Sequence, residues 1–519
     1  MKLVTAAQMR ELEAAAVAAG TSEAQLMEEA GLAVAQEAWM LLGTLEGRRI
    51  VVLAGPGKNG GDGLVAARHL SEWGADLVVY LPNWLRQEER LDELRNREIA
   101  VIDGREDGEG AVLDQAMQGC DLVIDALLGI GQQRPLETDE PITRALRQLA
   151  AARASYQPPK LVAVDLPSGI NADSGAVDDA TVEPDMTVTF GLPKVGMYQA
   201  PASGLLGKVQ VIDIGIPKAA QEAVKLELLT SRWVKSHLPR RPEDANKGTF
   251  GKVLVVGGSR RYVGAVQLAA LAAYRAGAGL VTVATTGYVT SHIAGSAAEV
   301  TWLPQPEAED GGLPDTTAIA LRNEWAAFHA AVLGPGLGDT GATRAFVWAA
   351  LPDLAGLWRG CVIDADGLNA LASMADGAER VPANAVLTPH PGELARLMGA
   401  TVAHVQARRL EVAGEAAARF GCTVVLKGAH SVIATADGRT SLSPWANPLL
   451  ATAGSGDVLA GMIAGYLAQG AEPFEAACLG VYLHGAAGEV LREEYGEAGL
   501  LAGEIAARLP RVVKDVAAP

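Results

Sequence analysis

Short, continuous hydrophobic runs alternate with longer amphipathic stretches along most of the chain. Runs of this kind, in which polar and apolar residues do not alternate, are typical of parallel strands buried on both faces. In the first half they lie at residues 48–54, 75–82, 97–103, 120–128, 160–169, 185–191 and 207–217. Because helical stretches separate these runs, the pattern predicts a doubly wound α/β domain.

The first 45 residues carry a helical pattern with two start signals. Thr5 with Gln8, and Ser22 with Gln25, each fit the capping box, in which two side chains satisfy backbone N–H groups at a helix start. Gly20 stands between them as a stop signal. The sequence therefore predicts two helices ahead of the first strand.

A polar segment divides the chain into two series of strands. Residues 218–247 are amphipathic and end in SHLPRRPEDANK, whose prolines and mixed charge are typical of a domain boundary. Further hydrophobic runs follow at residues 252–259, 279–286, 330–338, 361–369, 384–393 and 422–435. We therefore expect two α/β domains, at residues 1–220 and 229–519.

Composition and charge exclude several classes of function. The 519 residues carry a formal charge of −18, which disfavours nucleic acid and anionic membranes as partners. The charged N-terminus is unlike a signal peptide, and no apolar run is long enough to span a bilayer. The four cysteines do not have metal-binding spacing: Cys120, Cys361, Cys422 and Cys478. We therefore expect a cytoplasmic protein with buried, reduced thiols.

A glycine-rich segment follows the first predicted strand. Residues 55–63, GPGKNGGDG, satisfy the pattern G-x-G-x-x-G, a turn that presents backbone N–H groups to phosphate. The dinucleotide-binding fingerprint also needs an acid at the end of the next strand, where this sequence has Pro82 and Asn83. A conventional dehydrogenase is therefore disfavoured. Asp62, inside this segment, is by itself most simply a helix N-cap.

Three oxygen-bearing side chains lie at the carboxyl ends of predicted strands, the edge where open α/β sheets bind ligands. Asn59, Asp125 and Ser168 combine one carboxylate with neutral oxygens, which suits a monovalent cation; three independent loop caps are the alternative. Asp165 lies on the same edge and is not needed as a ligand, so it is the candidate for proton transfer. Lys194, in GLPKVG, is a candidate partner for Asp165.

The sharpest feature of the second half is ATAGSGDVLAGMIAG at residues 451–465. Its glycines and Ser455 can present backbone N–H groups at a helix start, which together form an anion hole. Asp457 is placed there to take a proton from a hydroxyl that attacks a phosphoryl group, and an ordinary N-cap is the alternative. Because backbone donors favour a carboxylate, we expect Asp457 to be ionised at neutral pH.

Two further loops lie at predicted strand ends of the second half. LKGAHS at residues 426–431 turns from one strand into another and is a candidate nucleotide-binding loop. TPHPGE at residues 388–393 holds His390 between two prolines, where a structural role and a role in a site both stay open.

Four segments of the first half resemble the NAD(P)H-hydrate epimerase domain: NGGDG at 59–63, DALLG at 125–129, VDLPSG at 164–169 and GKVQVIDIGIP at 207–217. The resemblance implies a Rossmann-like three-layer sandwich, with K⁺ held by Asn59, Asp125 and Ser168. The family usually has Asn where Lys58 stands and Thr where Ile130 stands. The implied substrate contacts are Lys58, Asn59, Gly60, Gly61, Asp62, Gly129, Ile130, Gly131, Gln132, Gln133, Arg134, Pro135 and Asp165.

The second half is similar to the ribokinase-like superfamily and, within it, to the ADP-dependent NAD(P)H-hydrate dehydratases. The similarity rests on KGTFGKVLVVGGS, GPGLG, IDADGLNAL, LTPHPGELARL, VLKGAH and the segment around Asp457. It implies a catalytic Asp457. The implied substrate contacts are Ala265, Gly336, His390 and Asp457, and the implied nucleotide contacts are Lys427, Gly428, Ala429, His430, Ser431 and Gly456. Asn246 and the pair Arg260 and Arg261 depart from the usual family residues.

Together the halves resemble the bifunctional NAD(P)H-hydrate repair enzymes. The resemblance implies that the R and S hydrates of NADH and NADPH are epimerised, and that the S form is dehydrated at the expense of ADP. It also implies K⁺ at the epimerase site, Mg²⁺ with the nucleotide, and a homo-oligomer. The alternatives are a vitamin or sugar kinase with an accessory domain, and a regulatory or scaffold protein whose first domain only binds nucleotide.

Overall fold

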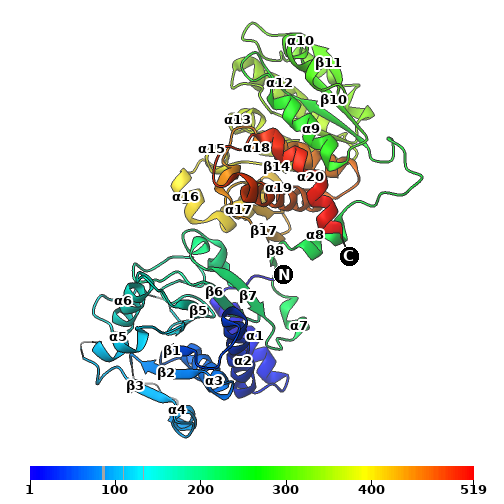
Figure 1. Ribbon diagram of the computed structural model, residues 1–519. Coiled ribbons are helices and arrows are strands. Elements are labelled where there is room, and N and C mark those ends of the chain that lie inside the picture. Colours follow the sequence, from blue (N-terminus) through cyan, green and yellow to red (C-terminus); the bar gives the residue numbers. More distant parts are fainter. Residues whose placement is uncertain (84–87, 109, 133, 519) are drawn as a thin grey trace. The chain divides into compact units, whose positions relative to one another are not determined.

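The computed structural model describes residues 1–83, 88–108, 110–132 and 134–518 (Figure 1). The chain divides into two compact units, Met1–Val224 and Lys225–Pro519. Among the described residues, no helix is both long and apolar enough to cross a membrane. All four cysteines are buried and unpaired, as the sequence predicts.

The two predicted N-terminal helices are present as α1 (Ala6–Ala18) and α2 (Glu23–Leu42). Both capping boxes form: the Gln8 backbone N–H donates to Thr5 Oγ1 over 3.2 Å, and the Thr5 N–H donates to Gln8 Oε1 over 3.0 Å. The same pair of bonds joins Ser22 and Gln25. Each helix therefore begins where the sequence places its start signal.

The described residues of the first unit form a seven-stranded parallel sheet in the order β3-β2-β1-β4-β5-β6-β7. Its strands are β1 (Arg49–Ala54), β2 (Asp76–Leu81), β3 (Ala100–Asp103), β4 (Leu122–Ala126), β5 (Lys160–Val164), β6 (Met186–Phe190) and β7 (Lys208–Ile212). The strand order reverses between β1 and β4, and open α/β sheets bind ligands at such a switch point. The predicted doubly wound sheet is confirmed.

Alternate residues of the strands pack into two hydrophobic layers. Val52 and Ile124 face α1, α2 and α3, whereas Val51 and Val123 face α5 and α6. The remaining helices of this unit are α3 (Lys58–Glu72), α4 (Glu88–Arg95), α5 (Ala111–Met117), α6 (Pro141–Arg153) and α7 (Lys218–Gln221). Burial on both faces explains why the strands are continuous hydrophobic runs.

The second unit has a ten-stranded sheet in the order β11-β10-β9-β12-β13-β14-β15-β16-β17-β8 among its described residues. The strands are β8 (Leu226–Leu228), β9 (Lys252–Val256), β10 (Leu280–Thr286), β11 (Thr301–Gln305), β12 (Ala330–Leu333), β13 (Gly360–Ile363), β14 (Ala385–Leu387), β15 (Thr423–Leu426), β16 (Val432–Ala434) and β17 (Thr440–Leu442). The strand β16 is antiparallel to both of its neighbours. The sequence patterns did not predict β8, β11 or β17.

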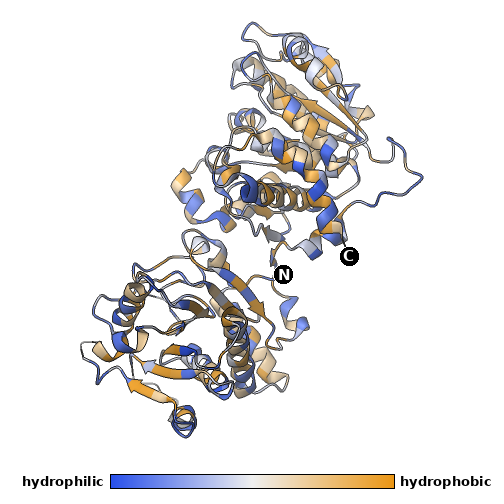
Figure 2. Ribbon diagram, viewed as in Figure 1, coloured by the Kyte–Doolittle hydropathy of each residue, from blue (hydrophilic) through white to orange (hydrophobic). Residues whose placement is uncertain are grey.

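The helices of the second unit surround one very apolar helix. They are α8 (Ser231–His237), α9 (Ala265–Ala276), α10 (Gly287–Ile293), α11 (Thr316–Leu321), α12 (Gly341–Leu354), α13 (Asp366–Ala372), α14 (Gly377–Arg380), α15 (Pro391–Met398), α16 (Val402–Ala407), α17 (Arg409–Phe420), α18 (Ser455–Ala468), α19 (Pro473–Tyr495) and α20 (Ala502–Ala517). A helix that is apolar on all of its faces needs to be buried on every side. Packing against α9, α19 and α20 buries α18 in this way. Figure 2 shows the connection from α8 to β9 as a largely polar segment, and this segment lies within the second unit.

The edge strand β8 decides where the second unit begins. Its Leu226 and Leu228 pair with Thr440 and Leu442 of β17, so a fragment that starts at residue 229 loses this strand. Leu228 is buried, and burying a leucine contributes about 1.5–3 kcal/mol. We expect fragment 225–519 to unfold at a higher temperature than fragment 229–519 in a thermal melt. Equal melting temperatures would show that β8 contributes nothing to the stability of the second unit.

Candidate active sites

The glycine-rich segment is mostly helical. The helix α3 begins at Lys58 with Gly57 as its N-cap, so Asp62 lies in the second helical turn and is not the cap. A Cβ on Gly60 would lie 1.9 Å from the Gly55 carbonyl oxygen, and a Cβ on Gly55 would lie 1.9 Å from the Leu127 carbonyl oxygen. The turn therefore packs directly on the end of β4, which only glycine permits.

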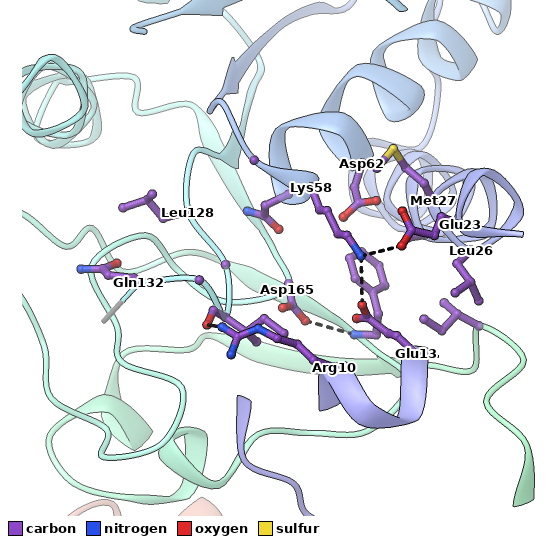
Figure 3. Close-up of a pocket in the computed structure, with 18 of the residues that line it drawn as sticks. Arg10, Glu13, Glu23, Leu26, Met27, Lys58, Asp62, Leu128, Gln132 and Asp165 are labelled. Carbon is purple, nitrogen blue, oxygen red and sulfur yellow. Dashed lines mark hydrogen bonds and ion pairs between the residues drawn. The ribbon is translucent and has the colours of Figure 1, made fainter. Parts of the chain in front are cut away.

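A cavity of about 550 Å³ opens at this edge of the first unit. It is covered by α1 and α2 and reaches the ends of β1, β4 and β5 (Figure 3). It brings together eight of the predicted substrate contacts: Lys58, Asn59, Asp62, Gly129, Ile130, Gly131, Gln132 and Asp165. Four others do not line it: Gly60 and Gly61 lie in the packed first turns of α3, and Arg134 and Pro135 lie outside. Gln133 falls outside the described residues.

Asp165 forms a buried ion pair with Lys194 at the floor of this cavity. The Lys194 ammonium also donates to Thr189 Oγ1 over 2.9 Å and to the Phe190 carbonyl oxygen over 3.1 Å. The Thr189 hydroxyl donates to Asp165 Oδ1 over 3.1 Å. The Asp165 backbone has φ +64°, a region that non-glycine residues rarely adopt. These contacts hold the Asp165 carboxylate in one position, and the predicted partner Lys194 is confirmed as its neighbour.

Asp125 and Ser168 meet behind the loop that follows β4. The Ser168 hydroxyl donates to Asp125 Oδ1 over 2.6 Å, and the Ser168 N–H donates to Asp125 Oδ2 over 2.9 Å. Burial raises the pKa of Asp125, although these hydrogen bonds oppose the effect. No ion pair in the described part of the chain involves Asp125. Asn59 lies against Gly129 of the same loop, and its buried Nδ2 has no partner among the described residues.

In the second unit, four charged side chains gather at the ends of β13, β14 and β15. Lys427 Nζ lies 2.6 Å from Asp364 Oδ1 and 3.9 Å from Glu393 Oε2. Burial alone would lower the pKa of Lys427, but the charges of Asp364 and Glu393 raise it. Burial also raises the pKa of Glu393 to about 7. Asp457 is the fourth member of the cluster, because the charges of Asp364, Lys427 and Glu393 all act on its pKa.

Asp457 is the third residue of α18, and Gly454, with φ +89°, is the N-cap. The N-cap alternative for Asp457 is therefore wrong. Burial raises the pKa of Asp457 to about 7, and the charge of Asp364 adds to the shift. The expectation that backbone donors keep Asp457 fully ionised at neutral pH is also wrong, because burial and neighbouring carboxylates outweigh the helix start.

Two predicted contacts around Asp457, Gly456 and His390, lie at helix starts. A Cβ on Gly456 would lie 3.2 Å from Lys427 Nζ, so backbone and ammonium approach closely. His390 is the N-cap of α15, where its Nδ1 accepts from the Gly392 N–H over 3.0 Å. Burial lowers the pKa of His390, with help from the charge of Lys427.

The other predicted contacts of the second unit lie in two places: at Ala265 and Gly336, and in the loop between β15 and β16. A Cβ on Gly336 would lie 3.0 Å from the Ala265 Cβ, so these two positions are adjacent. In the loop between β15 and β16, Gly428 and Ala429 are exposed, and the Ser431 hydroxyl donates to the Gly428 carbonyl oxygen over 3.0 Å. His430 of this loop is buried, with its Nδ1 3.0 Å from the Ser443 carbonyl oxygen.

Family models match two separate parts of the chain. The model described as YjeF-related protein N-terminus matches residues 23–196, and the one described as NAD(P)H-hydrate dehydratase matches residues 253–511. A bifunctional NAD(P)H-hydrate repair enzyme from Moorella thermoacetica is 39% identical, over 99% of this chain and 97% of that protein. The chain belongs to the bifunctional NAD(P)H-hydrate repair enzyme family.

Solved structures are similar to the second half of this family member. A hypothetical protein from Streptococcus mutans is 29% identical with a TM-score of 0.50, covering 56% of this chain and 100% of that chain. An ADP/ATP-dependent NAD(P)H-hydrate dehydratase from Bacillus subtilis, co-crystallised with ATP and Mg²⁺, is 34% identical with a TM-score of 0.48. It covers 57% of this chain and 100% of that chain. The predicted α/β fold is confirmed for both units, with a Rossmann-like strand order in the first.

Sequence reasoning missed several residues of both sites in this repair-enzyme chain. Arg10 and Glu13 of α1 line the first cavity, and the Arg10 guanidinium donates to the Ile130 carbonyl oxygen over 3.0 Å. Asp364 and Glu393 surround Lys427 in the second unit. The available signal was that Asp364 directly follows the apolar residues of β13 and that Glu393 stands at the start of the helix after β14, whereas nothing local marks Arg10 or Glu13.

Proposed function

We propose that this chain repairs NADH and NADPH that have been hydrated at C6 of the nicotinamide ring. The first unit interconverts the R and S epimers, and the second dehydrates the S form with ADP, giving NAD(P)H, AMP and phosphate. One observation carries the proposal: each unit holds its own cluster of buried acids at the carboxyl ends of its strands. The nearly full-length match to a bifunctional repair enzyme supports it.

The dehydration begins with a proton transfer to Asp457. Hydroxide is a poor leaving group, so the C6 oxygen first bonds to the β-phosphorus of ADP while Asp457 takes its proton and AMP leaves. The N–H groups at the start of α18, beside Lys427, stabilise the phosphoryl oxygens. The lone pair of the ring nitrogen then expels phosphate from C6, and loss of a C5 proton restores the reduced ring.

A Mg²⁺ ion belongs with the nucleotide in this proposal. Within the described ranges, no group of three or more His, Cys, Asp or Glu side chains could hold a metal ion. Mg²⁺ commonly binds through substrate phosphates, water and one or two carboxylates, so an ion that arrives with ADP fits this site. Bound there, it would neutralise phosphate charge during transfer.

A K⁺ ion fits the cluster formed by Asn59, Asp125 and Ser168. Asp125 is a buried carboxylate without an ion-pair partner in the described chain, and such a charge calls for a nearby cation. Asn59 lies against the same loop and would offer its amide oxygen, Oδ1, to the ion. We propose that K⁺ neutralises Asp125 and fixes the loop that carries Gly129.

Replacement of Asp125 tests the cation. Asp125→Asn keeps the shape and removes the only negative charge of the cluster, so K⁺ is expected to bind at least about tenfold more weakly. Epimerisation then needs correspondingly more K⁺, while dehydration is unchanged. The measurement is the epimerisation rate across a K⁺ titration at constant ionic strength, and coincident curves for the two proteins would refute the assignment.

One assay separates the proposed function from its alternatives. The full chain is incubated with hydrated NADH and ADP, and the absorbance of the reduced nicotinamide is followed. We expect the absorbance to return and AMP to accumulate. A vitamin or sugar kinase, or a scaffold protein, would leave the hydrate unchanged. Repeating the assay with ATP tests the nucleotide preference, and light scattering tests the expected homo-oligomer.

A further inference from the structure

Asp62 is an acid of the first cavity to which no proton transfer has yet been assigned. Its side chain comes from the second turn of α3 and is only 9% exposed. Figure 3 shows the carboxyl groups of Asp62 and Asp165 entering the same cavity from different elements. The two carboxyls differ in one respect: Asp165 pairs with Lys194, whereas Asp62 has no hydrogen bond or ion pair within the described residues.

The charges around Asp62 favour its neutral form. Burial raises the pKa of Asp62 well above its usual value, and the negative charges of Asp165 and Glu13 raise it further. Arg90 and Lys58 oppose this shift more weakly. The Lys58 ammonium is directed elsewhere, since it lies 3.5 Å from both Glu13 and Glu23 (Figure 3). The cavity thus combines a carboxyl group fixed by an ion pair, Asp165, with an unpaired one, Asp62, whose pKa is raised.

The epimerisation needs one proton acceptor and one proton donor. C6 of the hydrate bears both the ring nitrogen N1 and a hydroxyl, so it can open as a hemiaminal does. A base removes the hydroxyl proton, a C=O bond forms at C6, and the N1–C6 electron pair moves to N1, which takes a proton from an acid. Rotation about C5–C6 and closure on the other face return both protons and invert C6.

We propose that Asp62 is the proton donor to the ring nitrogen and that Asp165 is the acceptor of the hydroxyl proton. The assignment rests on the proposed epimerase function of this cavity. The Lys194 ammonium holds Asp165 as the acceptor, while the unpaired Asp62 carboxyl approaches the substrate from α3. On ring closure the two groups exchange roles, so the site returns to its starting protonation state.

The test compares Asp62→Asn with the wild-type full chain. An amide matches the size of an unpaired neutral carboxyl, so the variant is expected to fold, but it cannot transfer the proton. We expect kcat for epimerisation to fall by about 10²-fold or more, with KM within a few-fold. Wild-type kcat should decline on the alkaline side, as pH rises through the raised pKa of Asp62, and this decline should be absent in the variant.

Control variants separate this inference from the proposed function. Asp76→Asn, at the exposed amino end of β2, should leave the epimerisation rate and its pH profile unchanged. Asp62→Glu should retain the alkaline decline at a lower rate. Wild type that fails to convert purified R hydrate would overturn the epimerase itself. An epimerising wild type without an alkaline decline, or an Asp62→Asn variant with near-normal kcat, would overturn only the role of Asp62.

Discussion

An Asp457→Asn variant is expected to lose dehydration by roughly 10²-fold or more while it still epimerises the hydrate. The amide keeps the size of the side chain and the start of α18 but cannot accept the hydroxyl proton. The measurement is turnover of the S hydrate with ADP, alongside epimerisation on the same preparation. Turnover within a few-fold of wild type would show that Asp457 is not the base.

The same position predicts a pH dependence with a definite sign. Asp457 must be deprotonated to act as a base, so the dehydration rate should rise with pH through its pKa of about 7. Because the pKa is raised in the folded state, stability from this group is full at low pH and is lost as pH rises through 7. Asp457→Asn should therefore be more stable than wild type above pH 8, by on the order of 2–4 kcal/mol, with no gain near pH 4.

Loss of Lys194 is expected to have the largest effect on stability. Lys194→Met leaves the buried Asp165 carboxylate without its cation, and breaking one side of a buried pair costs about 3–5 kcal/mol. Epimerisation should fall by roughly 10²-fold or more, because Asp165 is no longer held in place. Hydrogen exchange of the full chain should show the loss of protection in residues 1–224, with dehydration retained.

A double variant separates stability from catalysis. Lys194→Met with Asp165→Leu removes both charges, and replacing a whole buried pair by apolar residues is often neutral for stability. We expect protection of the first unit to return while epimerisation stays absent. A single Lys194→Met variant with normal protection and normal epimerisation would show that the ion pair has no role in either.

The strand series of both units was predictable because most strands are buried on both faces and form continuous hydrophobic runs. The missed strands lack that pattern. The edge strand β11 contains Pro304, which a central strand would exclude, and β8 and β17 are three residues long with polar residues at their centres. Some predicted strands also extended too far at their carboxyl ends. The residues after Ala126 and after Leu333 form loops of the candidate sites instead.

The candidate sites were predictable where a residue lies at a strand end or at a glycine-rich helix start. Asp125 lies at the end of β4 and Asp165 directly follows β5, so the topology of an open sheet brings both to one edge of the first unit. In the second unit, Asp457 was marked by the glycine-rich start of α18. The covering helix α1 has no local signal that places it over the cavity. The pKa of Asp457 is raised first by burial and then by the charges of Asp364 and Glu393, which are distant in sequence. A local rule about helix starts therefore predicted the wrong direction of the shift.

Each described side chain of the first cavity belongs to Met1–Val224, and each one around Asp457 belongs to Lys225–Pro519. Under the proposed function, one polypeptide therefore carries two self-contained catalysts in a fixed one-to-one stoichiometry. A change in gene dosage alters total repair capacity but never the balance between epimerase and dehydratase. Two separate genes would need regulated expression to keep the two activities in a constant ratio, whereas here a single polypeptide carries both.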